Sequence, residues 1–243
     1  MPQMGLQGAK ILVVGGGSGI GHAVAQAALA EDAQITIAST NADKLAAASQ
    51  RLGGAAIALL DITDEAAVAA YFAGSGMFDH IVSTAGDWGE GGRGLIAELD
   101  MKKAEDLFRV RLWGSAILAK HGAPRLTPGG SLTFTGGMSA WRPAKGSVMA
   151  TAMAGLLAHL TLGLAKELAP LRVNAVFPGG VATEIYHSLS DSTRKAWETR
   201  YAFQPLPRTG EPDEVAEAYL YLMKAGYTTG QILQVDGGSM LAG

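Results

Sequence analysis

Short apolar runs alternate with longer helix-forming segments along the whole chain. The runs are rich in valine, isoleucine and leucine, which is typical of strands that are buried on both faces of a parallel sheet. The pattern predicts seven strands, over residues 11–14, 34–39, 55–60, 78–84, 131–135, 172–177 and 231–235. Helices are predicted between them, over residues 22–30, 43–52, 64–72, 101–126, 148–169, 183–201 and 211–224.

This regular alternation of strand and helix predicts an α/β fold. Parallel strands joined by right-handed crossovers place helices on both faces of the sheet. We therefore expect a single Rossmann-type, doubly wound domain with a seven-stranded parallel sheet over residues 1–243, because no linker or tandem repeat divides the sequence. The glycine-rich segment 87–94 is expected to be a loop.

The first predicted turn has the composition of an anion site. Gly15, Gly19 and Gly21 follow the first strand and open an alanine-rich helix. A glycine turn exposes backbone N–H groups, and the helix dipole adds positive potential, so the pyrophosphate of a dinucleotide would be held here. No Gly-Lys-Ser/Thr sequence follows, which excludes a nucleoside-triphosphate phosphate loop. The alternative is a purely structural turn.

Composition and charge narrow the range of partners. The 243 residues carry a formal net charge of −3 and contain no cysteine. Nucleic acid is therefore not an expected partner, and no disulfide or zinc–thiolate site is expected. We expect no metal site. The apolar segment 150–169 is interrupted by His159, Thr161 and Lys166, and no leader pattern precedes the first strand, so a cytoplasmic protein without a membrane span is expected.

The end of the second predicted strand bears on which nucleotide binds. NAD sites usually place an acidic residue about twenty positions after the glycines, where it accepts a hydrogen bond from the ribose. Ser39, Thr40 and Asn41 stand there instead, and Asp43 is interpreted as a favourable acid in the first turn of the next helix. Hydroxyl and amide groups can hold a 2′-phosphate, and no carboxylate at this position would repel it. NADP(H) is therefore favoured over NAD(H), although no arginine stands at the end of this strand to bind the phosphate.

These landmarks resemble the short-chain dehydrogenase/reductase family over nearly the whole chain. The motifs that carry the resemblance are the glycine loop 15–21, Asp61, Ala85-Gly86, Glu167-Leu-Ala-Pro170, Arg172-Val-Asn-Ala-Val-Phe-Pro-Gly179 with Thr183, Arg208-Thr-Gly-Glu-Pro-Asp-Glu-Val-Ala216 and Val235-Asp-Gly-Gly238. The resemblance implies a nicotinamide dinucleotide as cofactor. The residues implied to bind it are Gly15, Gly17, Ser18, Gly19, Ile20, Gly21, Ser39, Thr40, Asn41, Asp61, Ile62, Thr84, Ala85, Gly86, Pro178, Gly179, Val181 and Thr183.

The catalytic residues of the family are replaced in this sequence. The family uses a tyrosine with a lysine four residues later, together with a serine and an asparagine. Counted back from the Glu-Leu-Ala-Pro motif, the corresponding positions are Met149 for the tyrosine, Met153 for the lysine, Gly136 or Gly137 for the serine, with Ser139 close by, and Arg111 for the asparagine. A thioether can neither donate a proton nor carry a charge, so the two methionines are interpreted as apolar lining.

Other side chains could take over part of this chemistry. Arg111 could stabilise a developing oxyanion, or it could be a solvated helix residue. Ser139 could donate a hydrogen bond or could cap its own loop, and Lys145 is expected to be solvated in a loop. Tyr186 and His187 begin a segment, about 183–205, that covers the substrate in the family; they are either lid residues or acids.

Two functions are compatible with these features. The first is an NADP(H)-dependent oxidoreductase with a non-standard active site, acting on quinones or activated carbonyls that need little help from a proton donor. The alternative is a catalytically inactive nucleotide-binding sensor or partner subunit. The resemblance also implies a homodimer or homotetramer that pairs through the predicted helices 101–126 and 148–169.

Overall fold

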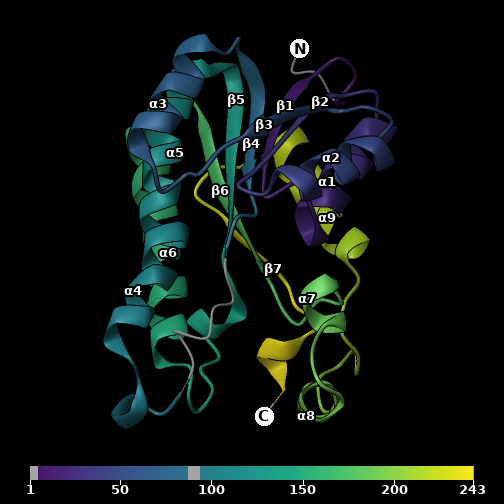
Figure 1. Cartoon of the computed structure of the whole chain (residues 1–243), viewed down its shortest axis with the longest axis vertical. Coiled ribbons are helices and arrows are strands. Elements are labelled where there is room, and N and C mark those ends of the chain that lie inside the picture. The colour runs from purple at the N-terminus through teal and green to yellow at the C-terminus, as the bar shows by residue number, and fades with distance from the viewer. Residues whose placement is uncertain (1–4, 87–93, 243) are drawn as a thin grey trace.

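The computed structural model describes residues 5–86 and 94–242, which form a seven-stranded parallel sheet (Figure 1). Its strands are β1 (Lys10–Val14), β2 (Gln34–Ser39), β3 (Ala56–Leu59), β4 (Phe78–Ser83), β5 (Leu126–Thr135), β6 (Arg172–Pro178) and β7 (Ile232–Val235). The spatial order is β3-β2-β1-β4-β5-β6-β7, so the winding direction reverses between β1 and β4. The predicted doubly wound α/β fold is confirmed, and a ligand crevice is expected where β1 and β4 end.

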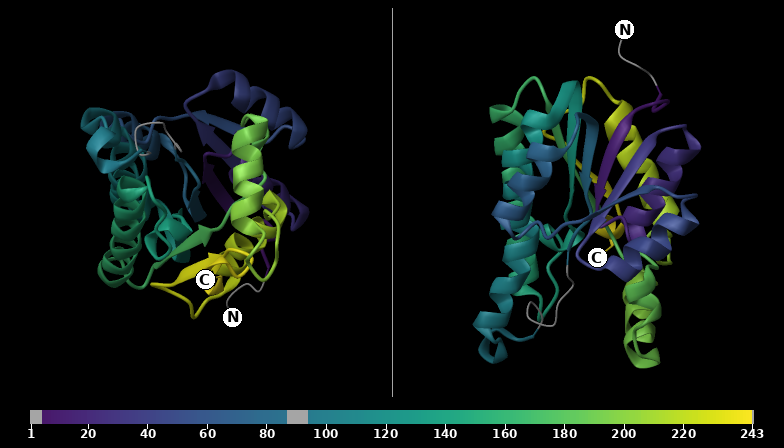
Figure 2. Two further views of the ribbon diagram at one scale, coloured as in Figure 1. Left: turned by 90° about the horizontal axis from the view of Figure 1, so that it is seen from below. Right: turned by 45° about the horizontal axis from the view of Figure 1, so that its top comes forward.

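Helices cover both faces of this sheet (Figures 1 and 2). One face carries α1 (Gly19–Ala30), α2 (Ala42–Arg51) and α9 (Pro212–Lys224), and the other carries α3 (Glu65–Gly74), α4 (Met101–Phe108), α5 (Ser115–Gly122) and α6 (Val148–Glu167). A π-helical segment, Arg109–Gly114, joins α4 to α5. The short α7 (Glu184–His187) and α8 (Asp191–Tyr201) lie beyond the carboxyl ends of the strands, and the right-hand view of Figure 2 shows α4 and α8 projecting on opposite sides of this edge.

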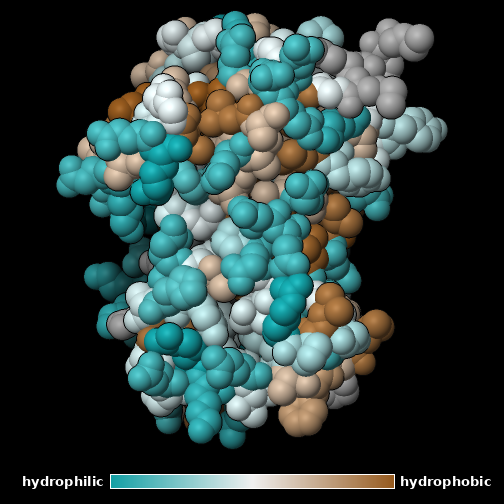
Figure 3. Space-filling model, turned by 90° about the vertical axis from the view of Figure 1, so that its right-hand side faces the viewer, coloured by the Kyte–Doolittle hydropathy of each residue, from teal (hydrophilic) through white to brown (hydrophobic). Residues whose placement is uncertain are grey.

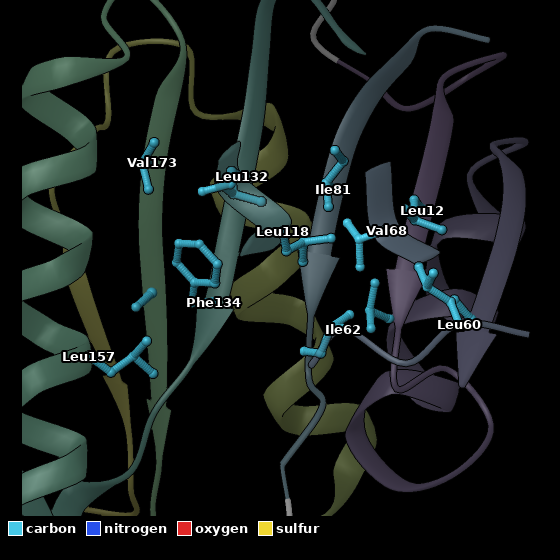
Figure 4. Close-up of a cluster of buried hydrophobic side chains, with 14 of the residues drawn as sticks. Leu12, Leu60, Ile62, Val68, Ile81, Leu118, Leu132, Phe134, Leu157 and Val173 are labelled. Atoms are coloured by element: carbon cyan, nitrogen blue, oxygen red, sulfur yellow. The ribbon is translucent and has the colours of Figure 1, made fainter. Parts of the chain in front are cut away.

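The strands are buried on both faces, as their unbroken apolar runs predict. In β1, Leu12 and Val14 belong to the cluster under α3, α5 and α6, whereas Ile11 and Val13 belong to the cluster under α1, α2 and α9. Figure 4 shows the first cluster, in which side chains of the sheet meet Leu118 of α5. Removal of this apolar surface from water is the main force that holds the layers together.

Two predicted elements around β5 differ from the structure. The strand begins at Leu126, not at residue 131, because Leu126 is buried and pairs with Phe78 of β4. The Pro-Gly-Gly sequence at residues 128–130 lies inside the strand, where the register with β4 is irregular, and Gly129 has a φ of +82°. The helix predicted over residues 101–126 accordingly ends as α5 at Gly122, followed by a single 3₁₀ turn.

The helix predicted over residues 183–201 is divided into α7 and α8. Ser190 caps the second of them, since its hydroxyl accepts a hydrogen bond from the Thr193 backbone N–H at 3.3 Å. A serine cap satisfies one of the unpaired N–H groups of a new helix, which explains the break. The predicted loop 87–94 lies, apart from Gly94, outside the described residues.

The surface of the molecule is uneven in polarity. Figure 3 shows the side that lies at the right in Figure 1, which is mainly hydrophilic, with apolar patches in its upper part and at its lower right edge. Within the described residues, α6 is the one helix that is long and apolar enough to cross a membrane by length and composition alone. Ala154, Leu157 and Thr161 of α6 are buried inside the protein, as in the core helix of a layered fold.

His80 gives the fold a pH dependence that can be measured. Its Nδ1 lies 2.8 Å from Ser131 Oγ between β4 and β5, and burial, assisted by the charge of Arg172, lowers the His80 pKa to about 4. In the unfolded chain the imidazole of His80 binds a proton below a pKa of about 6.5, whereas in the folded chain it stays neutral until about pH 4. The contribution of His80 to the free energy of unfolding is therefore full above about pH 6.5 and is lost as the pH falls toward 4. We expect the free energy of unfolding to fall by about 2 kcal/mol between pH 7 and pH 5 for this reason, and a His80→Gln variant to lose that dependence in urea titrations.

Thr133→Val is the matched control, because Thr133 is buried on the neighbouring strand and its replacement changes no ionisable group. Its stability should follow the pH as the unchanged chain does. If His80→Gln kept the same slope between pH 5 and pH 7, the histidine would not be the titrating group.

Candidate nucleotide-binding and active site

The turn between β1 and α1 packs tightly against the end of β4. A Cβ atom on Gly15 would lie 2.5 Å from Thr84 Oγ1, and one on Gly21 would lie 2.3 Å from the Gly15 carbonyl oxygen. Both contacts are too short for any side chain, and the φ of +86° at Gly15 also requires glycine. Thr84 Oγ1 donates a hydrogen bond to the Val14 carbonyl at 3.1 Å, which ties the two strand ends together.

Gly17 has a different role in the same turn. The nearest atom to a Cβ on Gly17 would be 3.7 Å away, so the missing side chain leaves open space in a cavity of about 570 Å³. Within the described residues, the Ser18 side chain does not cap α1. The first N–H groups of the helix are therefore available to an anion, and the cradle fits the pyrophosphate of a dinucleotide.

This cavity brings together most of the residues predicted to bind the cofactor. It is lined by Gly15, Gly17, Ser18, Gly19, Ile20, Gly21, Ser39, Thr40, Asn41, Asp61, Ile62, Thr84, Ala85, Gly86, Pro178 and Thr183. Gly179 lines a second, neighbouring cavity instead. Val181 lines neither of the two, because its side chain is buried in the core on the side of α9 and its backbone pairs with Gly210.

Polar groups at one end of the first cavity are held by local hydrogen bonds. Asp61 Oδ1 accepts from the N–H and the hydroxyl of Thr63, each at 2.8 Å. Asn41 Oδ1 accepts from the Lys44 N–H at 2.8 Å and caps α2, and Ser39 Oγ accepts from the Asn41 N–H at 3.4 Å. Lys44 itself lines the cavity, which places a cation beside these groups.

Arg111 lies where the two cavities meet. It belongs to the π-helical segment, is only 7% exposed, and lines both cavities. A Cβ on Gly86 would lie 2.3 Å from the Arg111 Cζ atom, so the guanidinium occupies the space that a side chain at position 86 would fill. Arg111 is therefore not the solvated helix residue that was the alternative at this position.

Arg111 contacts Thr135, whose side chain is hydrogen-bonded to Ser83 and Tyr219. Its Nη1 lies 3.5 Å from the Thr135 carbonyl oxygen, at the end of β5. Thr135 Oγ1 donates to the Ser83 carbonyl at 2.7 Å and lies 2.6 Å from the Tyr219 hydroxyl. Burial raises the pKa of Tyr219, so this phenol stays protonated and donates to Thr135. These hydrogen bonds hold Thr135 in place, and with it the carbonyl group that Arg111 contacts.

The second cavity, of about 250 Å³, is bounded on one side by α6. Ala150, Met153 and Ala154 line it, whereas Met149 is partly buried against the core and is not among the lining residues. Ala150 and Ala154 are thus the residues four positions apart that face the cavity. Of the two predicted lining residues, Met153 therefore lines the cavity and Met149 does not.

Two glycines and a serine form the floor between the cavities. A Cβ on Gly136 would lie 2.2 Å from the Phe177 ring, whereas one on Gly137 would meet nothing closer than Ser139 Oγ, at 3.9 Å. Ser139 lines the second cavity and donates a hydrogen bond to the Ala150 carbonyl at 3.3 Å, at the start of α6. Its hydroxyl therefore contacts the helix rather than capping its own loop.

The lid side of the second cavity is formed by α8. Trp197 and Tyr201, one helical turn apart, line the cavity, and a Cβ on Gly180 would lie 2.4 Å from the Tyr201 ring. Tyr186 and His187 do not line it: Tyr186 is buried, and its hydroxyl donates to Glu198 at 3.4 Å. Within the described residues, no group of three or more His, Cys, Asp or Glu side chains could hold a metal ion.

Comparison with known proteins decides the family. A family model described as Enoyl-(Acyl carrier protein) reductase matches residues 14–240. The short-chain dehydrogenase/reductase ATR9 of Stachybotrys chlorohalonatus is 34% identical over 97% of this chain and 98% of its own length. The chain belongs to the short-chain dehydrogenase/reductase family. It thereby shares the family's oxidoreductase character and NAD(P)-binding fold.

Two solved structures of short-chain dehydrogenase/reductase relatives are similar to this one. A small-chain dehydrogenase in complex with NADPH has a TM-score of 0.84 and 34% identity, and the match covers 97% of this chain and 100% of that chain. The MalC reductase/Diels-Alderase of Malbranchea aurantiaca has a TM-score of 0.88 and 32% identity, with 97% of each chain covered.

The structure adds residues to this short-chain dehydrogenase/reductase site that the sequence did not reveal. Lys44, Trp197 and Tyr201 stand in helices whose composition is that of a solvated surface. The one available clue was the spacing of the two aromatic residues, four positions apart in an otherwise polar helix. Ala150 and Ala154 were missed because an alanine carries no chemical signal in an alanine-rich helix.

The contrast between the two floor glycines can be tested by stability. Gly137 has extended backbone angles, φ −170° and ψ 154°, and open space beside it, so Gly137→Ser should leave the free energy of unfolding nearly unchanged. Gly136→Ser should lower it by about 3 kcal/mol, because the new Cβ overlaps the Phe177 ring. Urea titration measures both, and equal losses in the two variants would contradict this floor geometry.

Proposed function

We propose that this chain is an NADPH-dependent reductase of quinones or activated carbonyl compounds, in which Arg111 stabilises the developing oxyanion electrostatically. The observation that carries this proposal is the buried guanidinium of Arg111 at the junction of the two cavities. One cavity suits the dinucleotide, and the other is small and partly apolar, as expected for a substrate pocket.

The preference for NADP(H) rests on the end of the first cavity at α2. No carboxylate follows Ser39 directly, and Lys44 lines the cavity beside Asn41. A lysine ammonium is a common partner of a phosphate group. A 2′-phosphate would therefore be attracted here, whereas a bare ribose would gain nothing from the charge.

The chemistry of this site follows from the residues that surround the junction. The glycine turn, Gly15 to Gly21, would hold the cofactor, which would supply hydride to the carbonyl carbon, so negative charge would develop on the substrate oxygen. Arg111 carries a permanent positive charge in a buried setting, so it can stabilise that oxygen electrostatically. A guanidinium is a poor proton donor, and the α6 residues that line the pocket, Ala150, Met153 and Ala154, offer no proton at all. Arg111 is therefore assigned no proton transfer, and the proton that completes reduction is left to solvent.

A site that stabilises negative charge but donates no proton favours substrates whose product hydroxyl group is acidic. Hydroquinones and activated carbonyl products hold negative charge better than simple alcohols, so they depend less on a protein acid. The inactive-sensor alternative has no comparable support, because a buried arginine at the meeting point of the two cavities has a chemical role in reduction and no evident one in nucleotide binding alone.

Assembly and location complete the proposal. Trp113, Leu156 and Leu162 expose apolar side chains on the helices through which family members are implied to pair. We propose that a homodimer or homotetramer covers these side chains, and that the protein acts in the cytoplasm.

Arg111 is the residue to test first. NADPH oxidation should be followed with a panel of quinones, α-dicarbonyls and simple ketones, and we expect turnover mainly with the first two classes. Arg111→Met should lower kcat/KM on the order of a hundredfold, because one buried donor to a developing oxyanion is removed. Arg111→Lys keeps the charge and should retain part of the rate.

Lys103→Met is the control, because Lys103 is an exposed cation of α4 that lines neither cavity. NADPH affinity, measured separately by fluorescence, shows whether a loss of rate is a loss of binding. Silence of the unchanged chain across the panel, with NADPH firmly bound, would support the inactive-sensor alternative instead.

Lys44 provides a separate test of cofactor choice. Lys44→Met should weaken NADPH binding about tenfold, as expected for the loss of one cation beside a phosphate, and should leave NADH binding unchanged. NADH is the matched control, since the two nucleotides differ only in the 2′-phosphate. Equal weakening of both would show that Lys44 supports the fold of the turn rather than the phosphate.

A further inference from the structure

The second cavity is unusually rich in positive charge. Its lining includes Arg111, Arg142, Lys145 and Arg200, and among the described residues that line it there is no aspartate or glutamate. The chain as a whole carries a net charge of −3, so this collection of cations is a local feature and not a reflection of composition.

These cations come from different walls of the cavity. Arg142 and Lys145 belong to the segment before α6, and Arg200 projects from α8 on the lid, one turn from Trp197. Figure 1 shows α8 on one side of the strand ends and the start of α6 on the other. A molecule in the cavity therefore lies between positive groups on two sides, with Arg111 below it.

Among the described residues, Glu198 and Asp236 stand close in sequence to residues of this cavity and are engaged elsewhere. Glu198 accepts a hydrogen bond from the Tyr186 hydroxyl, behind the lid helix. Asp236 accepts from the backbone N–H groups of Gly238 and Met240, each at 2.9 Å. Neither carboxylate is among the lining residues, so neither neutralises Lys145 or Arg200 across the cavity.

We infer that the substrate of this site is an organic anion: a carbonyl or quinone compound with a carboxylate on a small, ring-sized apolar body. The inference rests on the proposed function for the reducible group, and on the charge of the cavity for the carboxylate. Arg111 is buried and is therefore little screened, whereas Lys145 and Arg200 are exposed at the cavity wall, so their attraction for an anion is weaker and falls with added salt.

The size and lining of the cavity indicate what the rest of the ligand, beyond its carboxylate, looks like. A volume of about 250 Å³ is below the range of drug-sized pockets, so roughly one or two rings fit. Leu107, Met153 and Trp197 offer apolar and aromatic surface for such a body. With its carboxylate held near Lys145 and Arg200, the compound would keep its reducible end toward Arg111 and the first cavity.

The test uses binding, so it does not depend on turnover. The probes are 2-naphthoate and its neutral analogue 2-naphthamide, titrated into the full chain with NADP⁺ present and followed by calorimetry. We expect naphthoate to bind roughly tenfold more tightly than naphthamide, and added salt to reduce this difference. Lys145→Met and Arg200→Met should each weaken naphthoate binding about fivefold and leave naphthamide binding unchanged.

Lys195→Met is the matched control, because Lys195 is an exposed cation on the same helix as Arg200 but does not line the cavity. It should leave the binding of both probes unchanged. Equal affinity for the two probes, no binding of naphthoate, or the same loss in Lys195→Met as in Arg200→Met would each overturn the inference.

Failure of this inference and failure of the proposed function are distinguishable. If NADPH reduces neutral quinones but naphthoate shows no preference over naphthamide, the reductase stands and the anion site is wrong. If naphthoate binding passes every test while no carbonyl or quinone is reduced, the anion site stands and the reductase is wrong.

Discussion

The close approach of the β1–α1 turn to the end of β4 is the constraint on which the site depends. Gly15 and Gly21 allow this approach because they lack side chains, and Thr84 fixes it with a hydrogen bond across the strand ends. The approach sets the position of the helix N-terminus, and with it the place where a phosphate can lie. Gly86, two residues after Thr84, then leaves the space that Arg111 occupies.

The second cavity owes its shape to close aromatic packing. At Gly136 the Phe177 ring occupies the space of a side chain, and Trp141 packs against that ring with centroids 5.0 Å apart. The aromatic pair fills volume beneath the floor and leaves Gly137 open above it. Charge is supplied instead by arginine and lysine side chains from the cavity walls. The site thus combines an apolar floor with positive walls.

The sequence predicted the sheet, its doubly wound order and the glycine turn, because these depend on local patterns. Buried strands read as apolar runs, and the turn needs glycine wherever it occurs. The burial of Arg111 could not be predicted, since it depends on Gly86 and Thr135 from distant parts of the chain. The same holds for Lys44, whose helix looks like a solvated one. In α6, Met153 lines the cavity as predicted, whereas Met149 packs against the core, because the packing of the whole helix decides which of its residues face the cavity.

The π-helical segment Arg109–Gly114 has a consequence for how this site arose and how it could be lost. A π-helical turn holds one residue more than an α-helical turn, so it accommodates a single-residue insertion inside an otherwise regular helix. Removal of one residue between Arg109 and Gly114 would close this wide turn to an α-helical one and change the direction in which the side chains of the turn point, with α4 and α5 keeping their relative orientation. The guanidinium would then leave its place over Gly86. The positive charge at the junction is therefore a property of the length of this segment as well as of its amino-acid identity.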